Sequence, residues 1–362
     1  MRNHIAVIAV CLVVRFPALG GAEEFAPVYS EHQDLSYYLD ASGNKQAIKS
    51  KADWEIRREH ILANMQVVMG KLPGKSQRVP LDARELEEAK LDGDLVRRKI
   101  SYQTEANDRV HAYLFLPAGE SKKRPAILCL HQTTNIGKEE PSGLGGNPNL
   151  HYALHLAQRG YVTLAPDYPS FGEHKFDFAD AKFGYTSGTM KAIWDNLRAV
   201  DLLQSLPEVD PQRIGCIGHS LGGHNTMFTA AFDPRIKVMV SNCGFTRFHK
   251  YYGGKLAGWT SARYMPLIAS RYENNPDKVP FDFPEIVAAF APRPFLASSP
   301  LHDSNFEVSG VKDTIAAAKA IYELYGKGDN LQANYPDCAH DFPEDMRKVA
   351  YEFFDKHLKA QP

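Results

Sequence analysis

The sequence predicts an α/β fold in which a mostly parallel, eight-stranded sheet is flanked by helices. From residue 95 onwards, short apolar runs alternate with segments of helical periodicity, and this alternation is typical of a parallel sheet wrapped by helices on both faces. Residues 125–130 read PAILCL, a continuous apolar run that suits a strand buried on both sides. Residues 311–325 carry apolar side chains at helical spacing.

Composition and charge exclude several other classes of protein. The chain has 362 residues, of which 44% are hydrophobic and 23% are charged, and these fractions exclude a mainly disordered chain. The formal net charge is -1 and like charges do not cluster, so neither a nucleic-acid partner nor a polybasic membrane patch is expected. No apolar run approaches the ~18 residues that span a bilayer, so no membrane span is expected. The oligomeric state carries no signal in the sequence.

The first residues predict export. Residues 1–22 combine a positive charge at Arg2, an apolar stretch over 5–14 and mostly small residues at 18–22, which is the order found in a secretory signal peptide. Arg15 at the end of the apolar stretch departs from that order. We therefore expect a secreted or periplasmic protein, and a buried N-terminal strand or helix is the alternative.

Residues 23–94 are predicted to form an N-terminal helical extension. Ile61, Met65 and Val68 recur at i, i+4 and i+7, which indicates an amphipathic helix over about 54–70. One such helix cannot bury its own apolar face, so we expect it to pack against the main domain.

Residues 95–362 are predicted to form that main domain. Eight strands are expected, at 95–102, 110–116, 125–130, 161–165, 213–217, 236–241, 295–299 and 331–335. Helices are expected at 152–158, 190–206, 311–325 and 344–358, with one more directly after Ser220.

Residues 243–287 interrupt the alternation of strands and helices. The segment is rich in aromatic residues and lacks clean periodicity, and a long irregular insertion in a compact domain is usually functional. We expect this cap-like insertion to lie over the strand ends and to offer Trp259, Arg263 and Tyr264 to a substrate, because pockets combine aromatic walls with a few polar groups. The alternative is that its aromatic residues form only a small core of their own.

The strongest chemical signal is the motif GHSLGG at 218–223. It follows a predicted strand and precedes a predicted helix, which is the setting in which G-x-S-x-G forms a sharp turn that exposes the serine. The glycines are needed because side chains beside the serine would clash. We predict Ser220 as a nucleophile, and a glycine-lined turn with an incidental serine is the alternative.

A serine hydroxyl needs a base, and the base needs an acid that orients it. With a nucleophile on such a turn, the order along the chain is serine, acid, histidine. His340 lies between the last predicted strand and the last predicted helix, where a base could reach Ser220. Asp303 follows the strand at 295–299 and is the predicted acid; Glu307 and Asp313 are its competitors.

The oxyanion that forms during acyl transfer needs backbone N–H donors. One is expected from Leu221, directly after the nucleophile, and the other from the loop after the strand at 125–130. In that loop Gln132 and Thr133 are equal candidates. Residues 131–134 read HQTT and contain no glycine, which leaves the path of the loop open.

No cofactor and no metal are expected. The histidines that could suggest a metal site do not pair at ligand spacing: His131, His174 and His302. His219 and His224 flank the nucleophile and are expected to pack beside it. Four cysteines are expected to be buried thiols, with a disulfide as the alternative: Cys129, Cys216, Cys243 and Cys338.

From about residue 95 to its C-terminus the chain resembles the α/β-hydrolase superfamily, most closely its acetyl xylan esterase-like and dienelactone hydrolase-like branch. The segments that carry the resemblance are 165–168, 207–214, 218–223, 291–295 with Asp303, and 338–343. Dienelactone hydrolases use a cysteine nucleophile, whereas this chain has serine. The resemblance implies a serine carboxylesterase that acts on a small-molecule or oligosaccharide ester, with an acetylated or otherwise esterified plant carbohydrate as the first expectation.

Two rival functions are considered. A serine peptidase of the prolyl-oligopeptidase type shares the order of the three residues but normally adds a propeller domain, for which the residues before 95 are too few. A non-catalytic binding protein with the same fold would be expected to lose one of the three.

Overall fold

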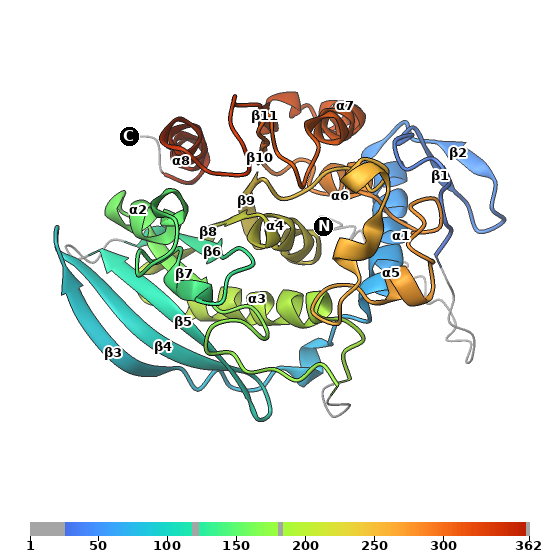
Figure 1. The fold of residues 1–362 in the computed structure, drawn as a ribbon. Coiled ribbons are helices and arrows are strands. Elements are labelled where there is room, and N and C mark those ends of the chain that lie inside the picture. Colours follow the sequence, from blue (N-terminus) through green and yellow to red (C-terminus); the bar gives the residue numbers. More distant parts are fainter. Residues whose placement is uncertain (1–25, 118–122, 180–183, 360–362) are drawn as a thin grey trace, which may run out of the picture.

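A nine-stranded mixed sheet forms the centre of the protein in the computed structural model, which describes residues 26–117, 123–179 and 184–359. The strands lie in the order β11-β10-β9-β8-β6-β7-β5-β4-β3 (Figure 1). Neighbours from β11 to β7 are parallel, and β5, β4 and β3 continue the sheet in antiparallel fashion. A separate antiparallel pair, β1 and β2, lies near the N-terminus of the described chain.

The strands are β1 (Tyr37–Leu39), β2 (Lys45–Ala47), β3 (Arg84–Leu91), β4 (Leu95–Glu105), β5 (Asp108–Pro117), β6 (Arg124–Leu130), β7 (Val162–Pro166), β8 (Val209–His219), β9 (Ile236–Asn242), β10 (Phe295–Ser298) and β11 (Leu331–Asn334). The α-helices are α1 (Lys51–Met69), α2 (Tyr152–Gln158), α3 (Gly188–Ser205), α4 (Leu221–Phe232), α5 (Leu267–Ser270), α6 (Phe283–Ala288), α7 (Val308–Leu324) and α8 (Glu344–Leu358).

The sequence predicts eight strands, and the main sheet has a ninth. The additional strand is β3, in a part of the chain that the sequence assigned to the helical extension. Its residues read RELEEAKL and are nearly all exposed, so no apolar alternation marks them. β3 is an edge strand held to β4 by backbone pairing, and charged side chains on an edge prevent pairing with other chains.

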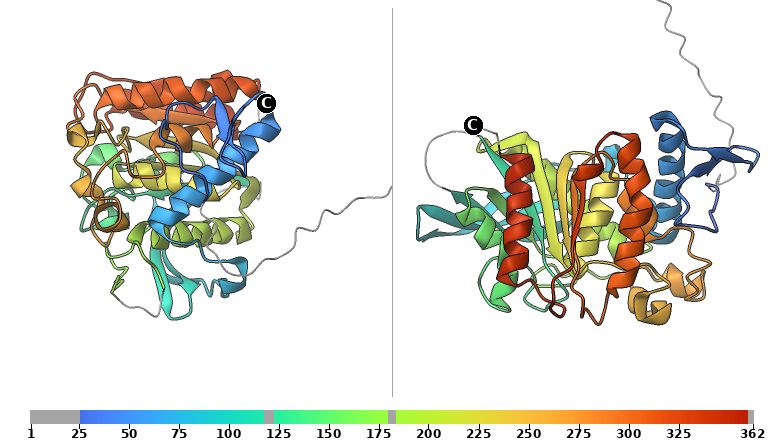
Figure 2. Two further views of the ribbon diagram at one scale, coloured as in Figure 1. Left: turned by 90° about the vertical axis from the view of Figure 1, so that its right-hand side faces the viewer. Right: turned by 90° about the horizontal axis from the view of Figure 1, so that it is seen from above.

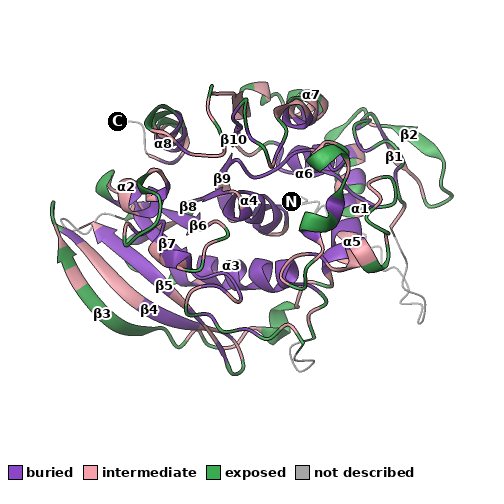
Figure 3. Ribbon diagram, viewed as in Figure 1, coloured by how far each residue is buried: buried purple, intermediate pink, exposed green. Residues whose placement is uncertain are grey.

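Helices cover both faces of the sheet, as the alternation of the sequence predicts. In β6, Ala126, Leu128 and Leu130 point into a core shared with helices α1, α3, α4, α6 and α7, whereas Ile127 and Cys129 point to the opposite face, against α2 and α8. The views from the side and from above show the sheet between these helical layers (Figure 2). Burial is deepest in the central strands and falls towards β3 (Figure 3).

The segment before β3 is anchored on the main domain through buried charges. Helix α1 begins at a capping box formed by Ser50 and Asp53. One turn further on, the buried Arg57 donates to Glu285 of α6 over 2.6 Å, and His32 contacts the other oxygen of that carboxylate at 2.8 Å. A buried charge is tolerated when it is paired and hydrogen-bonded. These contacts fix α1 against α6.

The insertion at 243–287 consists mostly of turns and short helical segments, and α6 lies at its end. Trp259 is 3% exposed and packs against the rings of Phe248 and Phe283. The aromatic residues of the insertion therefore join the main hydrophobic core and do not form a separate core of their own. Within the described residues, no helix is long and apolar enough to cross a membrane. The predicted signal peptide, 1–22, lies outside the described residues.

Candidate active site

Ser220 lies on a sharp turn between β8 and α4. Its backbone has a positive φ of 52° with ψ -115°, a combination that is rare and strained for a residue with a side chain. A Cβ on Gly222 would come within 1.8 Å of the Leu130 carbonyl oxygen, and one on Gly218 within 2.2 Å of the Gly222 backbone. The glycines of the motif are therefore required by close backbone approach, as the sequence predicts.

The structure brings His340 and Asp303 together. His340 Nδ1 lies 2.8 Å from Asp303 Oδ2, and the other carboxylate oxygen accepts the backbone N–H groups of Asn305 and Phe306 at 2.8 and 3.0 Å. Because Oδ2 is an acceptor, the His340 proton lies on Nδ1 and Nε2 is left to accept a proton. Of the two competing acids, Glu307 binds Ser309 and Asp313 binds Arg247.

The loop that carries His340 is held from two sides by Asp341. The Asp341 carboxylate accepts from Asn147 and Asn149 at 2.9 and 2.7 Å, and its backbone carbonyl accepts from the side chain of Asn242 at 3.2 Å. Among the described residues, no hydrogen bond joins Ser220 Oγ to His340. In unliganded hydrolases this bond is often long and shortens when substrate binds.

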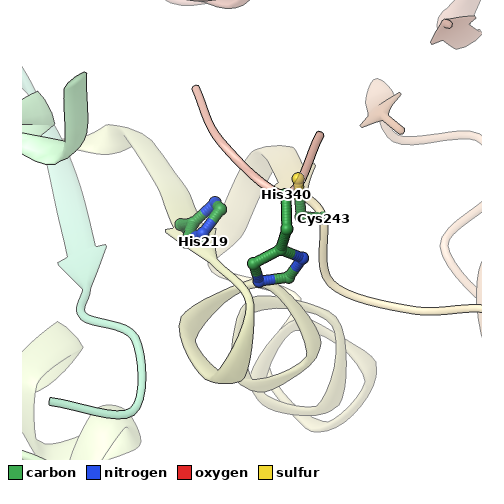
Figure 4. Close-up of side chains that lie close together, drawn as sticks. All are labelled: His219, Cys243 and His340. Atoms are coloured by element: carbon green, nitrogen blue, oxygen red, sulfur yellow. The ribbon is translucent and has the colours of Figure 1, made fainter. Parts of the chain in front are cut away.

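His219, Cys243 and His340 form a cluster behind the turn (Figure 4), with one potential ligand atom from each within 4.8 Å of the others. The Asn242 amide donates to His219 Nδ1 at 2.6 Å, so the His219 proton lies on Nε2. Burial lowers the pKa of His219 well below its usual value, and the nearby His340 lowers it further.

These protonation states do not suit a metal ion. A metal on His219 Nε2 would displace its proton, and a metal on His340 Nδ1 would break the bond to Asp303. Burial also raises the pKa of the Cys243 thiol well above its usual value. The cluster instead packs a neutral His219 ring 4.7 Å from the His340 ring.

The predicted oxyanion donors surround the nucleophile. Leu221 opens α4, where the first N–H groups have no partner inside the helix, and Leu221, Gln132 and Thr133 all line the cavity at Ser220. Gln132 is tied by its side chain to Glu140 at 2.9 Å, and the Thr133 hydroxyl contacts the Tyr264 hydroxyl at 3.0 Å. The N–H groups of Gln132 and Thr133 remain the two candidates for the second donor.

The path of this loop is determined by His131, a residue whose role the sequence did not reveal. His131 Nδ1 lies 2.6 Å from the carbonyl oxygen of Gln132, and its Nε2 accepts the backbone N–H of Tyr168 at 2.9 Å. Both ring nitrogens are thus used by a neutral imidazole, and burial lowers the pKa of His131.

A cavity of about 300 Å³ opens above Ser220, which is at the lower end of the usual size for ligand pockets. Leu221 and Gly258 line the cavity together with aromatic and neutral polar residues: Gln132, Thr133, Ser220, His224, Tyr251, Trp259, Tyr264, Asn305, Phe306 and His340. Of the predicted substrate contacts, Trp259 and Tyr264 are among them.

Arg263, the third predicted contact, does not line the cavity. Its guanidinium lies over the ring of Phe171, 4.1 Å from the ring centre, and its Nε donates to Ser170 Oγ at 2.8 Å. Arginine stacks readily on aromatic faces, so its side chain turns towards the loop after β7. The prediction for Arg263 therefore disagrees with the geometry.

A second buried polar cluster, which the sequence did not predict, lies outside this cavity. Asp108, His174 and Asp195 bring potential metal ligands together, but the Lys191 ammonium lies between the two carboxylates. It donates to Asp108 at 2.6 Å and to Asp195, and it lies 3.2 Å from Glu105. The ammonium thus supplies the positive charge that a metal would bring.

Comparisons with known proteins find similarity to hydrolases. Residues 149–361 match the model of the prolyl oligopeptidase family. The Bacillus subtilis protein named "Putative hydrolase YtaP" is 29% identical over 262 residues, which cover 70% of this chain and 85% of YtaP.

Two solved structures share the fold. A glucuronoyl esterase from Solibacter usitatus superposes with a TM-score of 0.71 at 20% identity, over 93% of this chain and all of the other. A "putative acetyl xylan esterase" from Bacteroides fragilis gives 0.60 at 18% identity, over 87% and 88%. The fold is therefore that of the α/β-hydrolases, as the resemblance implied.

Proposed function

The chain belongs to the prolyl oligopeptidase family, and we propose that within this family it is a serine esterase that hydrolyses esters of carbohydrates. The observation that carries the proposal is the arrangement of Ser220, His340 and Asp303. The aspartate holds the imidazole, and the imidazole and the serine line one cavity. A fold alone does not determine a function, so the proposal rests on these three residues and not on the fold.

The geometry supports a two-step reaction. His340 Nε2 takes the proton of Ser220 as its Oγ attacks the ester carbonyl, and the N–H of Leu221 with that of Gln132 or Thr133 stabilises the oxyanion. His340 then gives the proton to the leaving alcohol, which leaves an acyl group on Ser220. Water, deprotonated by His340, hydrolyses that acyl-enzyme. Asp303 stabilises the imidazolium in both steps.

The cavity favours a neutral, partly polar substrate. None of its lining residues is lysine, arginine, aspartate or glutamate, so no charge is offered to a charged group on the substrate. Aromatic walls with a few amides and hydroxyls suit a ring that has both apolar and hydroxyl-bearing edges. The names of the two similar structures, a glucuronoyl esterase and an acetyl xylan esterase, support a carbohydrate ester.

A serine peptidase is the second candidate, because the matching family model describes prolyl oligopeptidases. The same three residues would then attack an amide. Among the described residues, no acidic side chain lines the cavity to receive the amino terminus of a short peptide, which favours the ester.

The test is a substrate panel on the purified protein. We expect hydrolysis of p-nitrophenyl acetate, of acetylated xylo-oligosaccharides or of the methyl ester of glucuronic acid, and little release from prolyl or dipeptidyl p-nitroanilides. The Ser220→Ala variant controls for contaminating esterases. Efficient cleavage of the anilides without ester hydrolysis would establish the peptidase instead.

A further inference from the structure

His224 forms part of the wall of the cavity above Ser220. It lies one helical turn after the nucleophile on α4, so its side chain is on the same face of that helix. Its ring is surrounded by aromatic rings, with centres 4.8 Å away for Trp259, 6.3 Å for Phe306 and 6.4 Å for Tyr264. The sequence predicted only that His224 packs beside the turn.

The protonation state of His224 follows from one hydrogen bond. Nδ1 lies 3.2 Å from the backbone carbonyl oxygen of Gly244, and a carbonyl oxygen can only accept, so the proton lies on Nδ1. Burial lowers the pKa of His224 to about 3, although the bond to Gly244 opposes this. The ring is therefore neutral near neutral pH, and Nε2 is an acceptor with a free lone pair.

Because His224 Nε2 is an acceptor among aromatic rings, a hydrogen-bond donor beside it would be stabilised. A polar group taken out of water without a hydrogen bond loses free energy, and a donor on a bound substrate removes that penalty. The competing donor is the indole N–H of Trp259, which is fully covered and makes no hydrogen bond among the described residues. In the part of the chain described, no hydrogen bond joins that N–H to His224 and none is made by His224 Nε2. Because His224 lines the cavity and its Nδ1 is held by Gly244, Nε2 is the ring nitrogen left for a substrate donor.

We propose that His224 Nε2 accepts a hydrogen bond from a substrate hydroxyl, so that the enzyme selects neutral ring esters that carry hydroxyl groups over ring esters of the same size without them. The inference rests on the proposed esterase function and deepens it. A site built to hydrogen-bond a substrate hydroxyl discriminates strongly against the analogue that lacks it, because the polar group of the site is then left unpaired. For a single neutral hydrogen bond we expect a selectivity of about tenfold.

Two pairs of esters test the inference on the wild-type enzyme. On the acid side, the methyl ester of glucuronic acid is compared with methyl tetrahydropyran-2-carboxylate, which has the same ring without hydroxyls. On the alcohol side, 6-O-acetylglucose is compared with tetrahydropyran-2-ylmethyl acetate. We expect kcat/KM to favour the hydroxylated ester in one pair, which identifies the side of the ester that His224 contacts. Equal kcat/KM values within both pairs would overturn the inference.

Variants of His224 then assign the preference to its ring. His224→Phe keeps an aromatic ring but removes the acceptor, and we expect the ratio of kcat/KM within the preferred pair to fall about tenfold, mainly through KM. His224→Gln can donate to Gly244 and still accept from a hydroxyl, so it should restore part of the ratio. His249→Phe is the matched control, because His249 pairs with Asp277 and does not line the cavity.

The outcomes separate this inference from the proposed function. If the wild-type enzyme hydrolyses esters with a hydroxyl preference that His224→Phe leaves unchanged, His224 is a packing residue and the esterase proposal stands. If the purified protein hydrolyses neither pair nor p-nitrophenyl acetate, the esterase proposal itself is wrong. Should His224→Phe fail to fold, equal kcat/KM values within both pairs on the wild-type enzyme would still overturn the inference. If the wild-type enzyme does show a hydroxyl preference, His224→Leu, which also lacks an acceptor, replaces His224→Phe, and an unchanged preference in that variant would overturn the inference.

Discussion

His340 Nδ1 lies 2.8 Å from Asp303 Oδ2, across 37 residues of sequence. The carboxylate comes from the loop after β10 and the imidazole from the loop after β11, and these strands are parallel neighbours in the sheet. Parallel pairing places both carboxyl ends at one edge, where Ser220 also emerges from β8. The sheet therefore brings together residues that the sequence separates.

Asp303→Asn is the first test of this relationship. The amide cannot hold the His340 proton on Nδ1 as a carboxylate does, so we expect kcat to fall by about three to four orders of magnitude with the fold retained. Ester hydrolysis and circular dichroism measure the two properties. Glu307→Gln is the control, because Glu307 binds Ser309 and not the imidazole. An active Asp303→Asn together with an inactive Glu307→Gln would show that the wrong acid was chosen.

Ser220→Ala tests the nucleophile. Removal of the hydroxyl leaves the oxyanion donors and the cavity in place, so we expect turnover of p-nitrophenyl acetate to fall by a thousandfold or more. The melting temperature should change little, since alanine at this position has the same strained backbone conformation as serine. Turnover close to that of the wild-type enzyme would rule out the serine mechanism.

The sequence predicted the central elements well because burial determines them. The strand at 125–130 and the helices at 152–158 and 344–358 agree with β6, α2 and α8 to within a residue, since each has a continuous or periodic apolar pattern. β3 has no such pattern, because an exposed edge strand needs only backbone partners. Its charged residues therefore fell within the predicted helical extension.

The three residues proposed for the reaction could be selected from the sequence, and the structure brings them to one edge of the sheet, but the residues that surround them could not be predicted. Ser220 is marked by a motif, and His340 and Asp303 by their places after successive strands. His131 and His224 act through the hydrogen bonds of their ring nitrogens to backbone groups, and no local pattern reports such bonds. Of the cluster around Lys191, only Asp195 lies at a regular helical spacing, at i+4.

Tyr264→Ala tests whether the insertion selects the substrate. Tyr264 connects the insertion to the loop after β6 through its 3.0 Å contact with Thr133, and its side chain is only partly buried. We expect the ratio of kcat/KM for a bulky ester over that for an acetate to rise about tenfold, with a small drop in melting temperature. Tyr264→Phe keeps the ring and should keep the ranking of esters. An unchanged ranking in both variants would make the insertion a structural cover.

Trp259 differs from Tyr264 in that it also belongs to the main hydrophobic core. It contacts the rings of Phe248, Phe283 and Phe306 and is almost fully buried. Trp259→Ala should therefore destabilise the protein by about 3–5 kcal/mol, which thermal and urea unfolding would measure. A variant as stable as the wild type would show that the insertion contributes little to the fold.

The buried cluster predicts a dependence of stability on pH. Burial raises the pKa of Asp195 to about 6, although Lys191 and His174 oppose the shift and Asp108 adds to it. Asp195 therefore binds a proton more tightly in the folded than in the unfolded chain, whose pKa is about 3.9. Its contribution to stability is complete below pH 4 and is lost as the pH rises through 6.

Asp195→Asn removes this titration, because an amide stays neutral across that range. We expect the melting temperature of the wild type, relative to that of Asp195→Asn, to fall steadily between pH 4.5 and 7, since only the wild type has to ionise a buried carboxyl. Asp92→Asn, the same change in an exposed turn, controls for the loss of one negative charge. If the melting temperature of the wild type instead rises relative to that of Asp195→Asn as the pH increases, Asp195 is stabilised as an anion by Lys191. The proton is then carried by another member of the cluster.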